Sequence, residues 1–402
     1  SDRSPGVPDS LLDMQAVLTS LAIALLVPLG FLGFGSRRAG LLAGLAGLLH
    51  GPFAYHSLKM LPISLALATQ AAALLFLILA TGEGKSRHRV FAGLLAGLLA
   101  GLAALARAEF LLFILVGAAY LGYRNRSLGT PAAFLLGAGL LILPATVHNF
   151  KQGDTVLIAS AGGENLFIGN QSGADGGHTQ LSPAAPTLFS QRIEARAMAE
   201  SAAGKELRPS EISSYWTGRA FQEITADIPG WLGLLGKKFL RVLDPGDPAD
   251  MYSLSLERSI YLPGLYLLLL PAGFVLAAGA LGVAGSWRGE KSRPLLMFLG
   301  FHLAVLLLFF VSTRLRIPLY FGLALFAGFG LDRLVVAWRD GRRRIPMLAG
   351  TALILVLTVT GFIREAPVPR DRVRLAAVLS MQEKLDEGLA VLQPALCLLY
   401  TS

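Results

Sequence analysis

Long apolar segments recur along the sequence and leave few folds open to the chain. A helix that crosses the hydrocarbon layer of a bilayer needs about 20 apolar residues, with roughly 17 to 25 usual. Over the whole chain 54% of the residues are hydrophobic and 15% are charged, a balance for which a soluble protein has no need. Ten segments fit a span, at residues 17–34, 39–54, 60–80, 89–106, 109–123, 131–147, 260–284, 294–312, 316–338 and 346–363. The sequence therefore predicts an all-α polytopic membrane protein.

Basic residues lie in every second loop between these segments. Loops rich in Lys and Arg resist translocation and therefore face the cytoplasm. The clusters are Arg37/Arg38, Lys85/Arg87/Arg89, Arg124/Arg126, Arg288/Lys291/Arg293 and Arg339/Arg342/Arg343/Arg344. Because both flanks of residues 89–123 are basic, an even number of crossings separates them, and residues 107–109 are expected to form the outer turn of a helical hairpin. These loops account for the net charge of +9, so no nucleic-acid partner is expected.

Four regions follow from this pattern, two of them membrane bundles and two extracytoplasmic. They are residues 1–147 (six spans), 148–259 (extracytoplasmic segment), 260–363 (four spans) and 364–402 (extracytoplasmic tail). We expect a multi-pass protein of the inner (plasma) membrane. Within the first bundle, Gly93, Gly97 and Gly101 repeat at four-residue spacing, which predicts that helix backbones approach closely there.

The extracytoplasmic segment is predicted to be a small mixed α/β region. The expected elements are strands at residues 155–158 and 165–168 and helices near 187–203 and 211–226. Ser210 is well placed to cap the second of these helices. Residues 229–241 combine an apolar face with basic residues and an interfacial Trp, which predicts a helix on the membrane surface.

No metal and no cofactor is expected. Asp244, Asp247 and Asp250 lie close together before the seventh span, but their spacing lacks the pattern of a calcium loop. Cys397 is the one cysteine, so a cysteine metal site or a disulfide framework within the chain is excluded.

The tail carries a helical pattern over residues 375–392. Its core, Leu385-Asp-Glu-Gly-Leu-Ala390, is similar to the second helix of a tetratricopeptide repeat. One repeat cannot bury its own apolar face, so further repeats and a protein partner are expected in a longer protein. The alternative is a single amphipathic helix.

Three stretches carry a family resemblance. The first runs from His148-Asn149-Phe150 through Gly153-Asp154 to Gly169-Asn170, the second from Leu207 to Trp216 and on to Pro229-Gly-Trp231 and Lys237-Lys238, and the third from Ser312 to Tyr320. In this order and spacing they resemble the bacterial branch of the dolichyl-phosphate-mannose protein mannosyltransferases, glycosyltransferase family 39. Members of that family have the GT-C membrane fold, a helical bundle.

The resemblance implies a reaction. A sugar carried on a polyprenyl phosphate is transferred, with inversion, to a protein, lipid or glycan acceptor on the outer face of the membrane. The family's catalytic carboxylate is the Asp of an Asp-Glu pair in the first external loop. That loop is represented here only by residues 1–15, which hold no such pair. We therefore expect an N-terminally truncated chain whose catalytic Asp lies upstream of residue 1.

Five basic residues are candidates for binding the donor phosphate. Arg314 and Arg316 lie at the external end of the ninth span, where a guanidinium can hold a lipid phosphate. Arg107 lies in the outer hairpin turn, and His56 and Lys59 lie in another external turn. The alternatives are snorkelling of the two arginines to the interface, pairing of Arg107 with Glu109 or helix capping by Arg107, and simple solvation of His56 and Lys59.

Glu164, Asn165 and Asn170 are candidates for a sugar or acceptor cleft, because amides and carboxylates suit hydroxyl groups. The alternative is ordinary turn chemistry. Two polar residues inside spans, Gln70 and His302, are expected to hydrogen-bond neighbouring helices.

Two other functions remain open. A transporter or lipid flippase has ionisable residues or broken helices at the membrane midplane, whereas the charges here gather at the external face. A non-enzymatic envelope assembly protein would use the tail to bind partners.

Overall fold

The computed structural model describes residues 9–179, 181, 188–246, 254, 256–257, 270–340, 350–352, 354, 356, 376, 379 and 385–400. Among them there are helices and no strands. The N-terminal helices are α1 (Asp9–Phe34), α2 (Arg37–Leu49), α3 (Gly51–Ser57), α4 (Ile63–Ala80), α5 (Ser86–Ala106), α6 (Phe110–Asn125) and α7 (Gly129–Lys151). They are followed by α8 (Gly162–Asn170), α9 (Leu188–Ala203), α10 (Pro209–Ala226) and α11 (Ile228–Leu243). The C-terminal helices are α13 (Ala272–Ser286), α14 (Arg293–Leu308), α15 (Thr313–Asp340) and α18 (Leu385–Tyr400).

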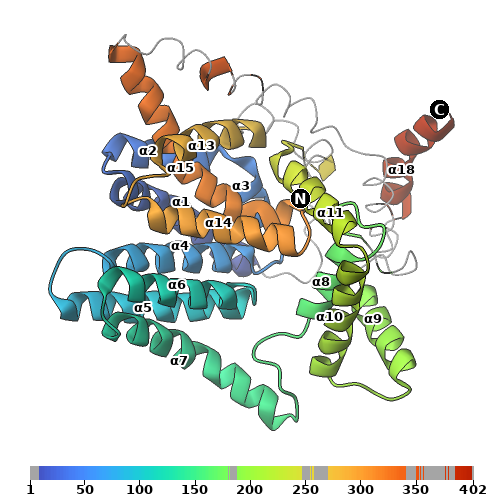
Figure 1. The fold of residues 1–402 in the computed structure, drawn as a ribbon. Coiled ribbons are helices and arrows are strands. Elements are labelled where there is room, and N and C mark those ends of the chain that lie inside the picture. The colour runs from blue at the N-terminus through green and yellow to red at the C-terminus, as the bar shows by residue number, and fades with distance from the viewer. Residues whose placement is uncertain are drawn as a thin grey trace.

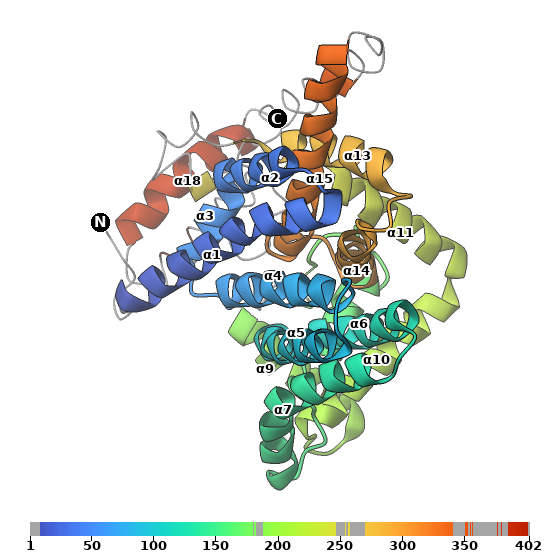
Figure 2. The same cartoon turned by 90° about the vertical axis from the view of Figure 1, so that its left-hand side faces the viewer.

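The helices confirm an all-α membrane protein. Five of those described are long and apolar enough to cross a membrane, namely α1, α4, α5, α7 and α15, and the apolar helices α6, α13 and α14 are shorter. Figure 2 shows them stacked in layers, with α4 between α1 and α5, and with α5 against α7. The count of ten spans stays a prediction, because most of residues 346–363 and residues 260–269 lie outside the described part of the chain.

The predicted second span, residues 39–54, is two helices instead of one. His50 is extended, with φ −82° and ψ 100°, and separates α2 from α3. Pro52 lies in the first turn of α3, where a backbone N–H would have no partner within the helix. Inside one continuous helix the proline would remove a backbone hydrogen bond and break the helix. The backbone break places the His50 side chain at the end of the bundle.

The expected close approach of helices at the glycine repeat is confirmed. A Cβ atom on Gly97 would lie 1.9 Å from the carbonyl oxygen of Phe134 in α7. A Cβ on Gly93 would also lie too close to Thr130, and one on Gly101 too close to Ala138, although at longer distances. Because glycine has no side chain, α5 and α7 lie with their backbones in contact.

Different loops and helices lie at the two ends of the bundle. One end, at the left of Figure 1, holds the turns after α1, α4, α6 and α13. There Arg38 pairs with Asp332 and Arg124 with Glu290. The other end holds the turn between α5 and α6, together with α3 and α8 to α11 (Figure 1). The grouping of basic loops agrees with their alternation in the sequence, and the side of the membrane that each end faces stays a prediction.

The polar segment after α7 contains helices and no strands in its described part, so its expected strands are wrong. Residues 165–168 lie inside α8, and residues 155–158 have no regular structure. The reason is tertiary packing. A Cβ on Gly163 would lie 1.9 Å from the carbonyl oxygen of Ser213, so α8 lies directly on α10. Phe167 then packs against Trp216, whose Nε1–H donates to the carbonyl of Ala195 in α9 at 3.1 Å.

The helices near 187–203 and 211–226 are confirmed as α9 and α10, but Ser210 is not the N-cap of α10. The helix begins at Pro209 with Arg208 as its N-cap. The Glu211 carboxylate accepts the backbone N–H of Arg208 at 2.8 Å, and Asp154 accepts that of Ser210 at 3.2 Å. An acid from a distant loop thus does what the local hydroxyl was expected to do.

In the tail, α18 contains the predicted Leu385–Ala390 core. A Cβ atom on Gly388 would lie 3.2 Å from the carbonyl oxygen of Ala376 and 3.7 Å from Leu379. The core therefore packs on a preceding part of the tail. Whether it belongs to a tetratricopeptide repeat stays a prediction.

Candidate functional site

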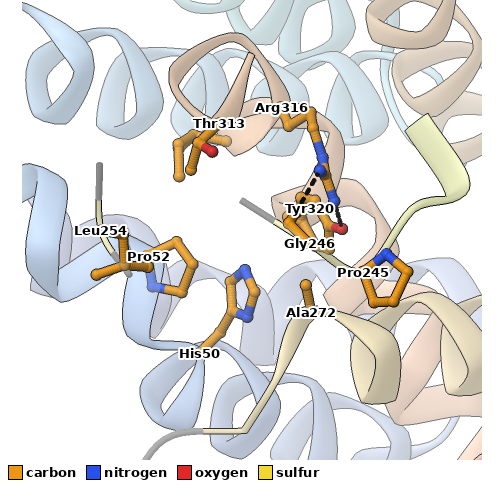
Figure 3. A pocket seen from close by; sticks show the side chains of 10 residues that line it. His50, Pro52, Pro245, Gly246, Leu254, Ala272, Thr313, Arg316 and Tyr320 are labelled. Carbon is orange, nitrogen blue, oxygen red and sulfur yellow. Dashed lines mark hydrogen bonds between the residues drawn. The ribbon is translucent and has the colours of Figure 1, made fainter. Parts of the chain in front are cut away.

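A small pocket lies where the break between α2 and α3 meets the start of α15 (Figure 3). It is lined by His50, Arg316 and Tyr320, and by Pro245 and Gly246 after α11. The His50 ring stacks on the Tyr320 ring, with centroids 4.9 Å apart. The cavity has a volume of about 20 Å³, enough for about one water molecule. A guanidinium, an imidazole and a phenol therefore meet at one end of the bundle.

Arg316 is buried, with 2% of its surface exposed. Its guanidinium donates to the carbonyls of Gly246 at 3.0 Å and Asp244 at 2.9 Å, and to the Tyr320 hydroxyl. These bonds tie the segment after α11 to α15. The Nε–H of Arg316 has no hydrogen-bond partner among the described residues, so the group keeps donor capacity. A buried, unused donor of this kind is a candidate anion contact.

Arg314 is half-buried in the first turn of α15. It lies two positions before Arg316, and residues at this spacing do not share a helix face. Arg314 does not line the pocket that holds Arg316. The pocket therefore contains one of the two arginines, and phosphate binding by either stays a prediction.

Lys59 and His56 lie at the end of α3 and beyond it. The Lys59 ammonium pairs with the carboxylate of Glu257, which also accepts the Tyr55 hydroxyl at 2.7 Å. The ammonium lies 4.8 Å from the centre of the Tyr55 ring. His56 is buried, with 3% exposure, so simple solvation describes neither residue. Lys59 fastens α3 to the chain before α13.

Arg107 forms an ion pair with Glu109 in the turn between α5 and α6. This pairing is the alternative to phosphate binding, and a phosphate would compete with Glu109 for the guanidinium. One terminal nitrogen of Arg107, Nη1, is buried and has no hydrogen-bond partner among the described residues. His302 of α14 is buried nearby in the aromatic core, with its ring centroid 4.5 Å from that of Phe298.

Glu164 and Asn165 lie in the first turn of α8 and are half-buried. Burial raises the pKa of Glu164, and the positive charge of Arg192 on α9 opposes that rise. A carboxylate in this setting can bind a hydroxyl or a cation. Glu164 and Asn165 remain candidates for a sugar or acceptor cleft.

Asn170, the third candidate of that group, holds two parts of the protein together. Its Nδ2 donates to the carbonyls of Leu166 and Leu308, both at 2.8 Å. Its Oδ1 accepts from Trp231 Nε1 at 3.0 Å and from Lys238 Nζ at 2.9 Å. An amide has two donors and two acceptor positions, and all are used here. Asn170 is 4% exposed, and its role in a sugar or acceptor cleft stays a prediction.

Lys238 of α11 is the centre of this junction. Its side chain is fully buried, and its ammonium also donates to the carbonyl of Leu307 at 2.9 Å. Leu307 and Leu308 end α14, and the last carbonyls of a helix attract cations because they lack intrahelical donors. Gly169 completes the contact, since its Cβ would lie 1.9 Å from the carbonyl oxygen of Phe309. We call Asn170, Trp231, Lys238 and the α14 carbonyls the junction network.

Because Lys238 is buried, we expect the protein to become more stable at alkaline pH. Burial lowers the pKa of Lys238 from 10.5 to about 8, whereas the unfolded chain keeps the ordinary value. Between these values the unfolded state binds a proton that the folded state does not, so the free energy of unfolding increases as pH rises through this window. Below about pH 8 Lys238 is protonated in the folded and the unfolded state, so it no longer makes the free energy of unfolding depend on pH. The melting temperatures of the wild type and of Lys238→Met, measured across this pH range, test the expectation. A difference between the two melting temperatures that does not change with pH would contradict it.

The described residues offer no group of three or more His, Cys, Asp and Glu that could hold a metal ion. Of the three aspartates before the seventh span, Asp244 accepts from Arg316 through its backbone carbonyl, and Asp247 and Asp250 lie outside the described residues.

Sequence reasoning missed His50, Glu257 and Lys238. A signal existed for His50, because an ionisable residue inside an expected span and directly before Gly51-Pro52 is unusual. Lys238 was assigned to the basic face of a surface helix, and only the tertiary contacts distinguish it from Lys237. No known family model, curated protein or solved structure matches the chain.

Proposed function

We propose that the protein is a membrane glycosyltransferase that moves a sugar from a polyprenyl-phosphate donor to an extracytoplasmic acceptor, with inversion. The proposal starts from the three stretches that resemble glycosyltransferase family 39. The observation that carries it furthest is the buried guanidinium of Arg316, which keeps an unused donor and lies beside His50 and Tyr320 in a pocket at the end of the bundle. The third family-like stretch supplies both Arg316 and Tyr320.

In this reaction the acceptor oxygen attacks the anomeric carbon while the bond from that carbon to the phosphate oxygen breaks. The acceptor proton passes to a general base, and negative charge grows on the departing phosphate. Arg316 stabilises that charge, and a donor already fixed by Gly246 and Asp244 needs no reorganisation during the reaction. The resemblance implies that this base is an Asp, and we assign it to no residue of this sequence.

A lipid flippase or transporter is the second candidate. The break between α2 and α3 at His50 favours it, because transporters build their sites at discontinuous helices. The two candidates differ in chemistry. A flippase moves the carrier lipid between leaflets and leaves the bond between sugar and phosphate intact.

Arg316→Ala is expected to lower transfer of label from a radiolabelled polyprenyl-phosphate sugar by about a hundredfold in proteoliposomes, as loss of one charge-stabilising donor does. Arg333→Ala is the matched control, because Arg333 is an exposed arginine of the same helix. Melting temperatures of both variants separate loss of chemistry from loss of the Gly246 contact. Absence of transfer by a folded, full-length wild type, or equal activity of the two variants, would refute the proposal.

A further inference from the structure

A large cavity opens at the end of the bundle opposite the His50 pocket. Its volume is about 950 Å³, within the range of roughly 300 to 1,000 Å³ typical of ligand sites. It is enclosed by the C-terminal ends of α1, α4 and α6, by the turn between α13 and α14, and by Phe329 of α15. It therefore lies between the N-terminal and the C-terminal groups of helices. None of the residues predicted to bind donor or acceptor lines it.

One wall of this cavity is apolar. Leu32 and Phe34 come from α1, Ile78 and Leu79 from α4, and Phe329 from α15. Phe34 stacks on Phe329, with ring centroids 4.6 Å apart, so the wall is continuous across the two groups of helices. A surface of this kind suits the acyl chain of a lipid, which packs there by van der Waals contact.

The rim of the cavity carries three cations, Arg124, Arg288 and Lys291, and two acids, Glu83 and Glu290. Arg124 is already neutralised, because it pairs with Glu290 at 3.5 Å. Arg288 and Lys291 also line the cavity and have no acidic partner among the described residues. Arg288 lies over the Trp287 ring at 4.5 Å. Two cations without acidic partners, beside a tryptophan of the kind enriched at membrane interfaces, form a site for an anion at headgroup depth.

We propose that this cavity binds an anionic membrane phospholipid. Arg288 and Lys291 contact its phosphate, and the apolar wall of α1 and α4 covers an acyl chain. The wall is what favours a lipid over a soluble phosphate, since a free anion makes no use of it. The site is separate from the proposed sugar transfer and holds whether or not that reaction occurs.

The test is lipid binding to the full chain in detergent, followed by native mass spectrometry and thermal melting. The ligands are phosphatidylglycerol, phosphatidylcholine and glycerol 3-phosphate. Arg288→Ala combined with Lys291→Ala is expected to weaken phosphatidylglycerol binding about thirtyfold, from the contribution of two basic residues near an anionic headgroup. Lys85→Ala combined with Arg87→Ala is the control, because both residues are exposed near the same end of the bundle, do not line the cavity, and remove the same charge.

Selective phosphatidylglycerol binding that the first double variant loses and the control keeps supports the proposal. Equal binding by both double variants overturns the assignment of Arg288 and Lys291. Glycerol 3-phosphate that binds as tightly as phosphatidylglycerol overturns the role of the acyl chain, and phosphatidylcholine that binds as tightly overturns the charge selectivity. Arg288 and Lys291 are exposed, so the double variant is expected to fold, and its melting temperature without lipid checks this.

Discussion

Asn170→Leu is expected to lower the free energy of unfolding by about 3 kcal/mol or more. The substitution nearly conserves volume but removes the acceptor of the buried Lys238 ammonium and of Trp231, and it removes the donor to Leu308. A hydrogen bond to a charged group contributes about 1.5 to 3 kcal/mol, and the buried ammonium that loses this partner also keeps its desolvation penalty. An unpaired buried carbonyl adds about 1 kcal/mol or more. Thermal or denaturant unfolding of the purified protein measures the loss.

Asn165→Leu is the matched control for this prediction. Asn165 lies on the same helix, is half-buried and forms no side-chain hydrogen bond among the described residues, so its replacement should change the unfolding free energy by less than about 1 kcal/mol. Combining Asn170→Leu with Lys238→Met removes the stranded cation, and the double variant should be more stable than Asn170→Leu alone. Strictly additive effects of the two substitutions would show that the junction network does not couple α8 to α11.

The helices of the bundle could be predicted from the sequence because their causes are local. A long apolar run flanked by basic loops fixes a span by composition alone, and the turn at Arg107 followed from counting crossings between two basic flanks. The close approach of α5 to α7 was equally predictable. A side chain missing every fourth residue leaves a groove on one face of a helix, and in lipid such a groove is filled by another backbone.

The candidate site was less predictable because its contacts join residues far apart in the sequence. Asn170 and Lys238 each sit in a family-like stretch, but nothing local says that one accepts from the other. Glu257 was not considered as a partner of Lys59, 198 positions away. Residues 166–168 are apolar and include Phe167 and Ile168, which favour a strand, but these residues lie in α8, where Phe167 packs on Trp216.

The cations of the chain now fall into groups with different physical roles. Lys59, Arg107 and Arg124 are neutralised by acids, while Lys238 is held by neutral oxygen atoms alone. Arg316 is held by neutral oxygens too, yet it keeps a donor free beside a pocket. Composition could not separate these roles, because each depends on which oxygen the fold brings near.

Gly97→Leu is expected to separate α5 from α7 and to lower the free energy of unfolding by about 3 kcal/mol or more. Its first side-chain carbon would lie 1.9 Å from the Phe134 carbonyl oxygen, and backbone cannot move aside as a flexible side chain can. The gain in helix propensity from replacing glycine, about 1 kcal/mol, is too small to offset this. Gly139→Leu on α7 is the control, since a Cβ there meets nothing within 4 Å. Equal melting temperatures of the two variants in detergent would contradict the close contact of α5 and α7.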